Sequence, residues 1–254
     1  MSVIALVVAA TVTGCGTTGA EPTEDLQAGV QVNSSRPVPG DTLQTAIAST
    51  AAATPPPGTT EQLPGLGPLT LARIPGKTKQ VVLVTGDAKN SSRAHLVIYQ
   101  RTLSGWQAGT KWPAHNALKG WTDNHHAGDL HSPIGVFSLT DAGGRLANPG
   151  TKLPYDRSPS FVISGTGFDG EPLAGSFDYV VAINYNRVKG TTPLNSTRPE
   201  GEAKGGDIWL HVDHSGPTHG CVTVAKNHMK ELLRTLNPAL HPVIVMGDAT
   251  SLLK

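Results

Sequence analysis

The chain has 254 residues, of which 15% are charged, and its formal net charge is +1. Glycine (29 residues) and proline (20 residues) are abundant, a composition that favours a loop-rich β protein over a helical bundle. With a net charge close to zero, the chain does not have the excess of basic residues that is typical of a nucleic-acid-binding protein.

The chain begins with an apolar run, Ser2 to Val12, that is too short to span a bilayer, which needs ~20 residues. The run ends in Val12-Thr13-Gly14-Cys15, which resembles a bacterial lipobox, whose cysteine is lipidated and becomes the first mature residue. The Lys or Arg expected before such a run is missing, and an ordinary strand is the alternative interpretation. We expect residues 1–15 to be a lipoprotein signal peptide, with Cys15 carrying the membrane anchor.

Residues 16–76 are rich in threonine, alanine, proline and glycine, as in Ala51-Ala-Ala-Thr-Pro-Pro-Pro-Gly58. Such a segment cannot bury enough apolar surface to offset the entropy that it loses on ordering. We therefore expect a disordered tether that holds a catalytic domain away from a membrane. A disordered leader without that role predicts the same lack of structure.

From Gln80 onward, short runs of β-branched and aromatic residues alternate with turn residues, as in a β protein. A long loop is expected at 113–132. The expected strands are 81–85, 95–99, 106–112, 135–140, 161–164, 179–184, 207–212 and 243–246.

One amphipathic helix is expected near the end of the chain. Thr223 is its predicted N-cap, Asn237-Pro238 ends it, and its apolar face repeats at i, i+3, i+4 and i+7 through Met229, Leu232, Leu233 and Leu236. The whole pattern predicts a mainly β domain over residues 77–248, a sandwich or partly closed barrel with one packed helix.

The segment from Gly205 to Asn227 carries the densest set of reactive side chains. Cys221 follows Gly220 and three nearby histidines, His211, His214 and His219. A nucleophilic thiol needs a base and backbone donors for the charge that develops on the attacked carbonyl. A lone cysteine is usually a small apolar core residue. In an exported protein whose Cys15 is lipidated, however, Cys221 would be an unpaired thiol in an oxidising compartment, which favours a chemical role.

The position of Cys221 just ahead of the expected helix would place it at the positive end of the helix dipole, which favours a thiolate. Two histidines could act as its base. His219 lies two residues before it, and side chains at i and i+2 of an extended chain point the same way ~6.5 Å apart. His211 reaches the thiol only if the loop 212–218 doubles back, and Ser215-Gly216-Pro217 supplies the turn residues for that return. Sequence geometry leaves both open.

Other constellations compete with a cysteine nucleophile. A zinc site could use His211, His214 and His219, or the loop residues His125, His126, Asp129 and His131. No HExxH motif is present, and solvated side chains are the default in a Gly/Asp-rich loop. A serine hydrolase lacks its Gly-x-Ser-x-Gly elbow here.

Further polar residues have two interpretations. Arg187 could bind a carboxylate, although a solvated strand end is the simpler interpretation. Asp213 and His214 could orient the site, or they could be solvated loop residues.

The run Thr218-His219-Gly220-Cys221-Val222-Thr223 resembles the nucleophile motif of the YkuD-type L,D-transpeptidases, in which Ser or Thr precedes His-Gly-Cys, a hydrophobic residue and often Asn. Thr223 in place of that Asn, and a short loop from His211 to Cys221, depart from the family. The likeness runs from about Lys79 to Met246 and includes His131-Ser-Pro-Ile-Gly-Val-Phe137, Leu153-Pro-Tyr155, Tyr179-Val-Val-Ala-Ile-Asn-Tyr-Asn186 and Ile208-Trp-Leu-His211.

This resemblance implies a YkuD-like fold and an exported enzyme, anchored on the outer face of the cytoplasmic membrane, that acts on peptidoglycan stem peptides. Cys221 would form a thioester with one stem and pass it to a second stem, giving a three-to-three crosslink. The base would be His211, and the N–H groups of Gly220 and Cys221 would stabilise the oxyanion. The implied catalytic set is Cys221, His211, Gly220 and His219, and the implied substrate contacts are Tyr155, Trp209, Thr218 and Thr223.

The resemblance implies no metal or organic cofactor, and it makes β-lactams of the carbapenem type expected inhibitors. Within the same class the alternative is an L,D-carboxypeptidase, with water as the acceptor. From a different class, the alternative is a non-catalytic wall-binding lipoprotein.

Overall fold

The computed structural model describes residues 58–254. The predicted signal peptide, Cys15 and the tether as far as residue 57 lie outside these residues. Across 58–254, no helix is long and apolar enough to cross a membrane.

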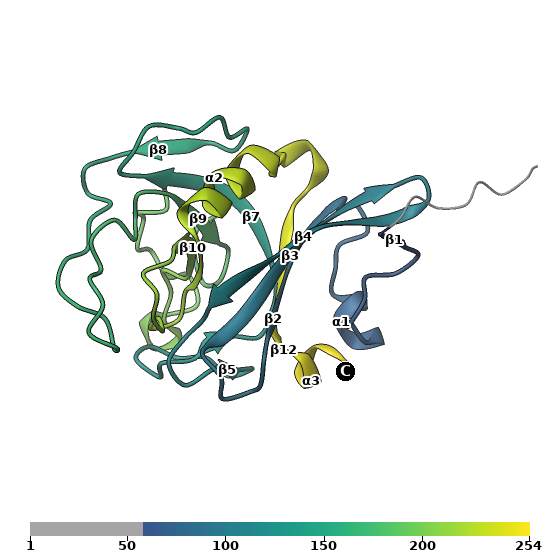
Figure 1. Cartoon of the computed structure of the whole chain (residues 1–254), viewed down its shortest axis with the longest axis horizontal. Coiled ribbons are helices and arrows are strands. Elements are labelled where there is room, and N and C mark those ends of the chain that lie inside the picture. The colour runs from purple at the N-terminus through teal and green to yellow at the C-terminus, as the bar shows by residue number, and fades with distance from the viewer. Residues whose placement is uncertain (1–57) are drawn as a thin grey trace, which may run out of the picture. The chain divides into compact units, whose positions relative to one another are not determined.

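Strands make up most of the regular secondary structure in the described residues (Figure 1). They are β1 (Thr59–Thr60), β2 (Gln80–Gly86), β3 (Arg93–Thr102), β4 (Gly105–His115), β5 (Trp121–Thr122), β6 (Ser132–Pro133), β7 (Gly135–Gly144), β8 (Tyr155–Arg157), β9 (Val180–Ile183), β10 (Trp209–Val212), β11 (Val222–Val224) and β12 (Val243–Asp248). The α-helices are α1 (Pro68–Ala72), α2 (Lys226–Thr235) and α3 (Ala249–Leu252), and short 3-10 turns occur at η1 (Glu202–Lys204) and η2 (Pro238–Leu240).

Eight of the strands close into a barrel. They follow one another in the order β4, β11, β10, β9, β7, β12, β2 and β3, and β3 pairs back onto β4. The pairs β10–β11 and β12–β2 are parallel, and the other pairs around the barrel are antiparallel. The predicted mainly β architecture is confirmed, and its barrel form is fully closed.

The barrel wall is buried on both sides, because alternate residues of a strand pack into two different apolar clusters. Val82 and Val84 of β2 belong to the interior core, whereas Val81 and Leu83 belong to a second cluster on the outer face. This alternation follows from the two-residue repeat of a strand. The helix α2 contributes Met229, Leu232 and Leu233 to the interior core, as its apolar spacing predicts.

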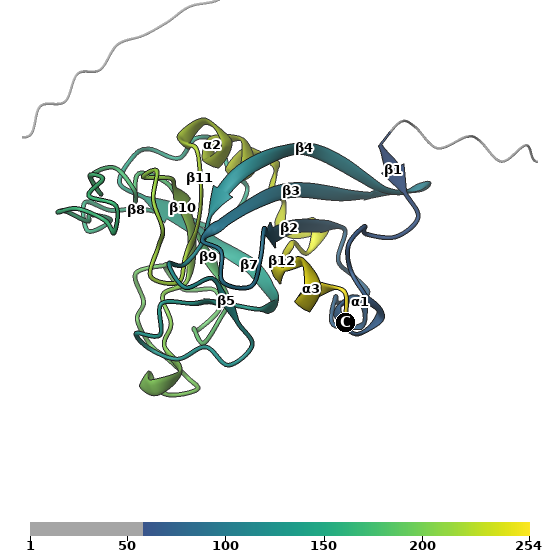
Figure 2. The same cartoon turned by 60° about the horizontal axis from the view of Figure 1, so that its bottom comes forward.

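The segment 58–76 is folded, which corrects the prediction that the tether continues to residue 76. β1 pairs with β4, and Leu63 and Leu66 are buried in the outer cluster. The Gly67 N–H donates to the carbonyl of Leu252, so α1 lies beside α3 (Figure 2). The prediction failed because it rested on the average composition of residues 16–76, whereas the leucines near the end of this segment supply enough apolar surface to pack. The domain also extends past 248 through α3.

Two predicted elements are wrong. Residues 161–164 are not a strand: Phe161 is buried, but Val162 is 59% exposed, and the segment covers the outer face of β9 and β10 as a loop. The N-cap of α2 is Ala225, because Val222–Val224 is occupied as strand β11 beside β10. Thr223 therefore belongs to the barrel wall.

Candidate active site

The parallel pairing of β10 with β11 brings Cys221 close to His211. His211 is in register with Thr223, so Cys221 lies level with Trp209, and the Trp209 N–H contacts Cys221 Sγ at 3.4 Å. Residues two apart on a strand point to the same face. Cys221 and His211 therefore project from the same face of the sheet, which is the outer face of the barrel.

A single cavity of about 160 Å³ is lined by both side chains. Its walls come from two segments, the connection between β8 and β9 and the loop that follows β10. The lining residues are Ile163, Gly167, Phe168, Leu173, Ser176, Phe177, His211, His214, Pro217, Thr218, His219 and Cys221. Four of the predicted site residues, Cys221, His211, His219 and Thr218, thus meet at one place.

His211 is held as a neutral imidazole in one tautomer. Its Nδ1 donates a hydrogen bond to the Val212 carbonyl at 3.0 Å, which leaves Nε2 as the nitrogen with a free lone pair. Burial is the main cause that lowers the pKa of His211 to about 4. The ring also meets Phe177 edge-on at 5.2 Å. A neutral, oriented imidazole is the form that a general base requires.

The thiol of Cys221 is also neutral at physiological pH. Burial raises the pKa of Cys221 to about 12, and the thiol lies 3.6 Å from the Asp207 carbonyl oxygen, which can accept its proton in a hydrogen bond. The predicted stabilisation of a thiolate by the start of α2 is wrong, because β11 separates Cys221 from that helix. Any nucleophilic attack by the sulfur therefore needs a base that removes the proton during the reaction.

Two hydroxyl groups fix the turn that carries Cys221. Ser132 Oγ donates to the Gly220 carbonyl at 2.8 Å, and Thr218 Oγ1 donates to the Cys221 carbonyl at 2.7 Å. Within residues 58–254, no backbone carbonyl accepts a hydrogen bond from the N–H of Gly220 or Cys221. Neither N–H is therefore taken up by a backbone partner among these residues, and of the two residues only Cys221 lines the cavity. No motif in the sequence indicates the part played by Ser132, which lies far from Cys221 along the chain.

The other predicted substrate contacts do not line the cavity. Thr223 is fully buried and donates to Asp213 Oδ1 at 2.7 Å. Tyr155 donates its hydroxyl to the Leu146 carbonyl at 3.0 Å. The roles of Thr223 and Tyr155 as substrate contacts stay predictions that the cavity beside Cys221 does not support. Trp209 packs between Phe161 and Phe177, so it supports the floor beneath Cys221.

A buried hydrogen-bonded pair, His214 and Glu171, borders His211 and was not predicted. The His214 ring stacks on the His211 ring, with centroids 6.0 Å apart. His214 Nδ1 lies 2.8 Å from Glu171 Oε1, and the two side chains are only 5% and 10% exposed. The sequence left His214 open between a residue that orients the site and a solvated loop residue, because the distant Glu171 gives no local signal.

Arg187 forms a second buried ion pair. Its Nη1 lies 2.9 Å from Asp141 Oδ2, and both side chains are 4% exposed. The guanidinium group also donates to Asn184 Oδ1 and to the Thr191 carbonyl. These partners occupy Arg187 inside the protein, so the interpretation as a solvated strand end is wrong, and the carboxylate that Arg187 binds is that of Asp141.

The loop histidines surround Asp129. His125 Nδ1 lies 3.0 Å from Asp129 Oδ1, while His126 and His131 approach Asp129 Oδ2 at 3.6 and 3.9 Å. Among the described residues, no group of three His, Cys, Asp or Glu side chains has a geometry that could hold a metal ion.

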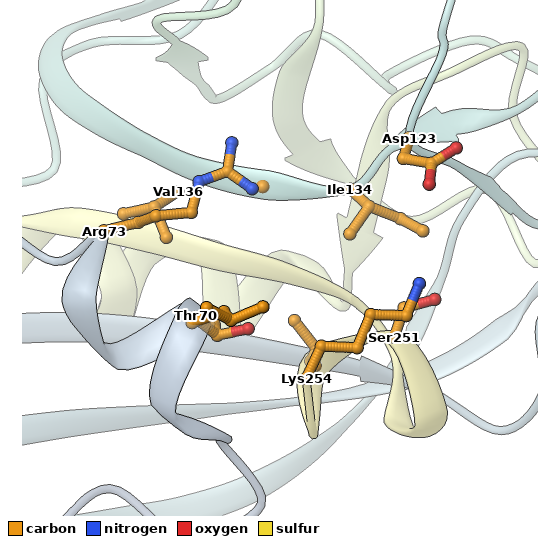
Figure 3. Close-up of a pocket in the computed structure, with 10 residues that line it drawn as sticks. Thr70, Arg73, Asp123, Ile134, Val136, Ser251 and Lys254 are labelled. Carbon is orange, nitrogen blue, oxygen red and sulfur yellow. The ribbon is translucent and has the colours of Figure 1, made fainter.

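A different cavity, of about 150 Å³, lies between α1, α3 and the start of β7 (Figure 3). Arg73 and Lys254 line it with Asp123 and Ile134. It holds none of the predicted site residues, and no nucleophile–base pair borders it. The cavity beside Cys221 is therefore the better candidate for an active site.

No protein-family model and no curated protein sequence matches the chain. Among solved structures, the chain is similar to the Bdellovibrio bacteriovorus protein Bd1075, with 19% sequence identity and a TM-score of 0.39. The similar region covers 67% of this chain and 48% of that chain, so the chain matches about half the length of the Bdellovibrio protein. A likeness at this level carries no functional argument.

Proposed function

We propose that the protein is a cysteine acyltransferase of the L,D-transpeptidase class that acts on peptidoglycan stem peptides. One observation carries this proposal: Cys221 and His211 line the same cavity, with His211 neutral and its Nε2 free to accept a proton. The Thr-His-Gly-Cys motif around Cys221 supplies the link to this class of enzyme.

The reaction begins when His211 removes the proton of Cys221 as the sulfur attacks the carbonyl of the third residue of a tetrapeptide stem. The N–H groups of Gly220 and Cys221 stabilise the oxyanion. The carbon–nitrogen bond to the terminal D-Ala then breaks, and His211 returns its proton to the leaving amine. The enzyme is left as a thioester.

A side-chain amine of a second stem attacks the thioester and passes a proton to His211. The carbon–sulfur bond breaks, the proton returns to the sulfur, and a three-to-three crosslink is released. With water as the acceptor, the same steps yield a tripeptide, and the enzyme is an L,D-carboxypeptidase. The proposed anchor at Cys15 would keep this chemistry on the outer face of the cytoplasmic membrane.

The test is incubation of the purified full-length protein with tetrapeptide stems, followed by mass analysis. Crosslinked dimers support transfer, and tripeptides without dimers support the carboxypeptidase. A Cys221→Ser variant serves as the matched control and should give neither product. Unchanged stems with the wild-type protein would support the non-catalytic wall-binding lipoprotein.

A further inference from the structure

Residues 165–175, which we call the flap, form one wall of the cavity that contains Cys221. The flap belongs to the long connection between β8 and β9 (Figure 1). It folds on itself through a bridge between Thr166 and Pro172 and a hydrogen bond from the Gly167 N–H to the Glu171 carbonyl at 2.8 Å. It is thus a compact unit with its own internal hydrogen bonds.

Glycines stand at both ends of the flap. Gly165 has φ +90° and Gly175 has φ +89°, values that L-residues with a side chain rarely adopt. A Cβ on Gly165 would meet no atom within 4 Å. A Cβ on Gly175 would meet only the Asp178 carboxylate, at 3.6 Å. Both ends therefore have little packed around them, which is what a hinge requires.

The flap contacts the loop after β10 at two places. Glu171 Oε1 lies 2.8 Å from His214 Nδ1, and the Phe168 ring lies 4.7 Å from the His219 ring. The Glu171 carboxylate sits between two glycines: a Cβ on Gly167 or Gly216 would lie 1.9 or 2.1 Å from Glu171 Oε1. The backbones of the flap and of the loop thus approach closely around this one carboxylate.

The surroundings of Glu171 favour the ionised form of its carboxylate. Burial acts to raise the pKa of Glu171, but hydrogen bonds from the backbone N–H groups of Glu171 and Asp169, and from His214, outweigh it and hold the pKa below its usual value. Removal of either partner leaves the other with an uncompensated buried group, so the closed flap loses stability relative to an open one.

The size of the closed cavity decides what can enter it. Its volume is about 160 Å³, whereas pockets that bind drug-sized ligands measure about 300–1,000 Å³. A peptide donor that reaches Cys221 needs more room than the closed arrangement provides. The flap is the wall that has hinges and few anchoring contacts, so it is the wall that can move to enlarge the cavity.

We propose that Glu171 and His214 form a latch that keeps the flap closed over Cys221, and that this latch separates before an acyl donor of peptide size reaches the sulfur. The identity of the donor rests on the proposed function, but the latch does not. His214 is a positioning residue in this arrangement, because it joins the flap on one side and stacks on His211 on the other.

The latch is tested by the rate at which iodoacetamide alkylates Cys221, followed by intact-mass spectrometry of the full-length protein. We expect Glu171→Gln and His214→Gln to raise this rate by about tenfold, since both substitutions weaken an interaction made only in the closed state. Glu202→Gln is the matched control, because it removes an ion pair with Arg198 on an exposed side chain. Rates equal to the wild-type rate in both latch variants would overturn the proposal.

Hydrogen exchange provides a second readout that distinguishes an open flap from a disrupted fold. Because the flap opens as a unit, the amides of Gly167 and Leu173, which donate within the flap, and the amides of β2 should exchange as in the wild-type protein. Faster exchange at Gly167 and Leu173 would show that the flap itself unfolds. If β2 also exchanges faster, the fold is disrupted and the Phe168→Ala variant is used instead. This substitution removes the contact between the flap and His219. Faster alkylation of Cys221 then supports the latch, whereas an unchanged rate refutes it. Neither measurement requires acyl transfer. If Cys221 is alkylated faster in the latch variants but the protein is never acylated, the latch is supported and the proposed function is contradicted.

Discussion

The rings of His211 and His214 stack with an interplanar angle of 17°. Burial is the main cause of the low pKa of His211, and positive charge on His214 lowers it further. The proposed base is therefore kept neutral by its surroundings, and its neighbour is held in place by Glu171. The pair of histidines connects the flap to the chemistry of Cys221.

The low pKa of His211 predicts the pH dependence of acylation. A base is active only when it is unprotonated, so with a pKa of about 4 His211 stays active through mildly acidic pH and loses activity as the pH falls through about 4. We expect acylation of Cys221, measured by single-turnover mass analysis, to show no inflection near pH 6.5. A loss of rate centred on the ordinary pKa of histidine would contradict this assignment.

Carbapenems should acylate the same cysteine. A strained β-lactam carbonyl reacts with a thiol whose proton is removed by a neighbouring base. Intact-mass spectrometry should show one adduct on the wild-type protein and none on Cys221→Ser. A wild-type mass that stays unmodified after long incubation would favour the wall-binding lipoprotein.

Strands such as β2 and β12 were predictable because each contains a short continuous run of β-branched and other apolar residues, which is typical of a strand buried on both faces. The strand β11 was missed because it has only three residues, Val222–Val224, and a short apolar run before a helix resembles the start of that helix. This error placed the expected start of the helix at Thr223, just after Cys221, and gave a wrong expectation for the thiol.

The site could be predicted only as far as its residues are close in sequence. The motif that contains Cys221 lies ten residues after His211, and strand pairing then brings the two together. Glu171, in a loop, and Ser132, in β6, lie far from Cys221 along the chain, so their hydrogen bonds depend on the closed barrel. The same holds for Leu63 and Leu66, whose burial requires the outer face of β2.

The two cysteines should have separable roles. We predict that Cys15→Ala, expressed from its native start in a Gram-positive host, releases the protein into the medium, because the lipobox cysteine carries the anchor. The reaction of Cys221 with a carbapenem should not change. Continued membrane association of Cys15→Ala would contradict the proposed lipid anchor, and a disulfide between Cys15 and Cys221 would contradict both roles.

The choice of base can be tested by comparing two histidines in the same cavity. His211 ends a barrel strand and is fixed by the Val212 carbonyl, whereas His219 lies on the loop and contacts Phe168 of the flap. A general base typically contributes about 10²–10⁴-fold to a rate, so His211→Gln should lower the acylation rate by about that factor. His219→Gln should lower it clearly less, because a loop side chain that packs on the flap is not oriented by the strand.

Both rates are measured by single-turnover mass analysis, and circular dichroism checks that each variant keeps its fold. Glutamine fits the space of the imidazole and can still accept a hydrogen bond, but it cannot take up the thiol proton at neutral pH. The loss in His211→Gln therefore reports proton transfer and not a change of packing. A larger loss in His219→Gln than in His211→Gln would transfer the role of base to His219 and would leave His211 as a structural residue of β10.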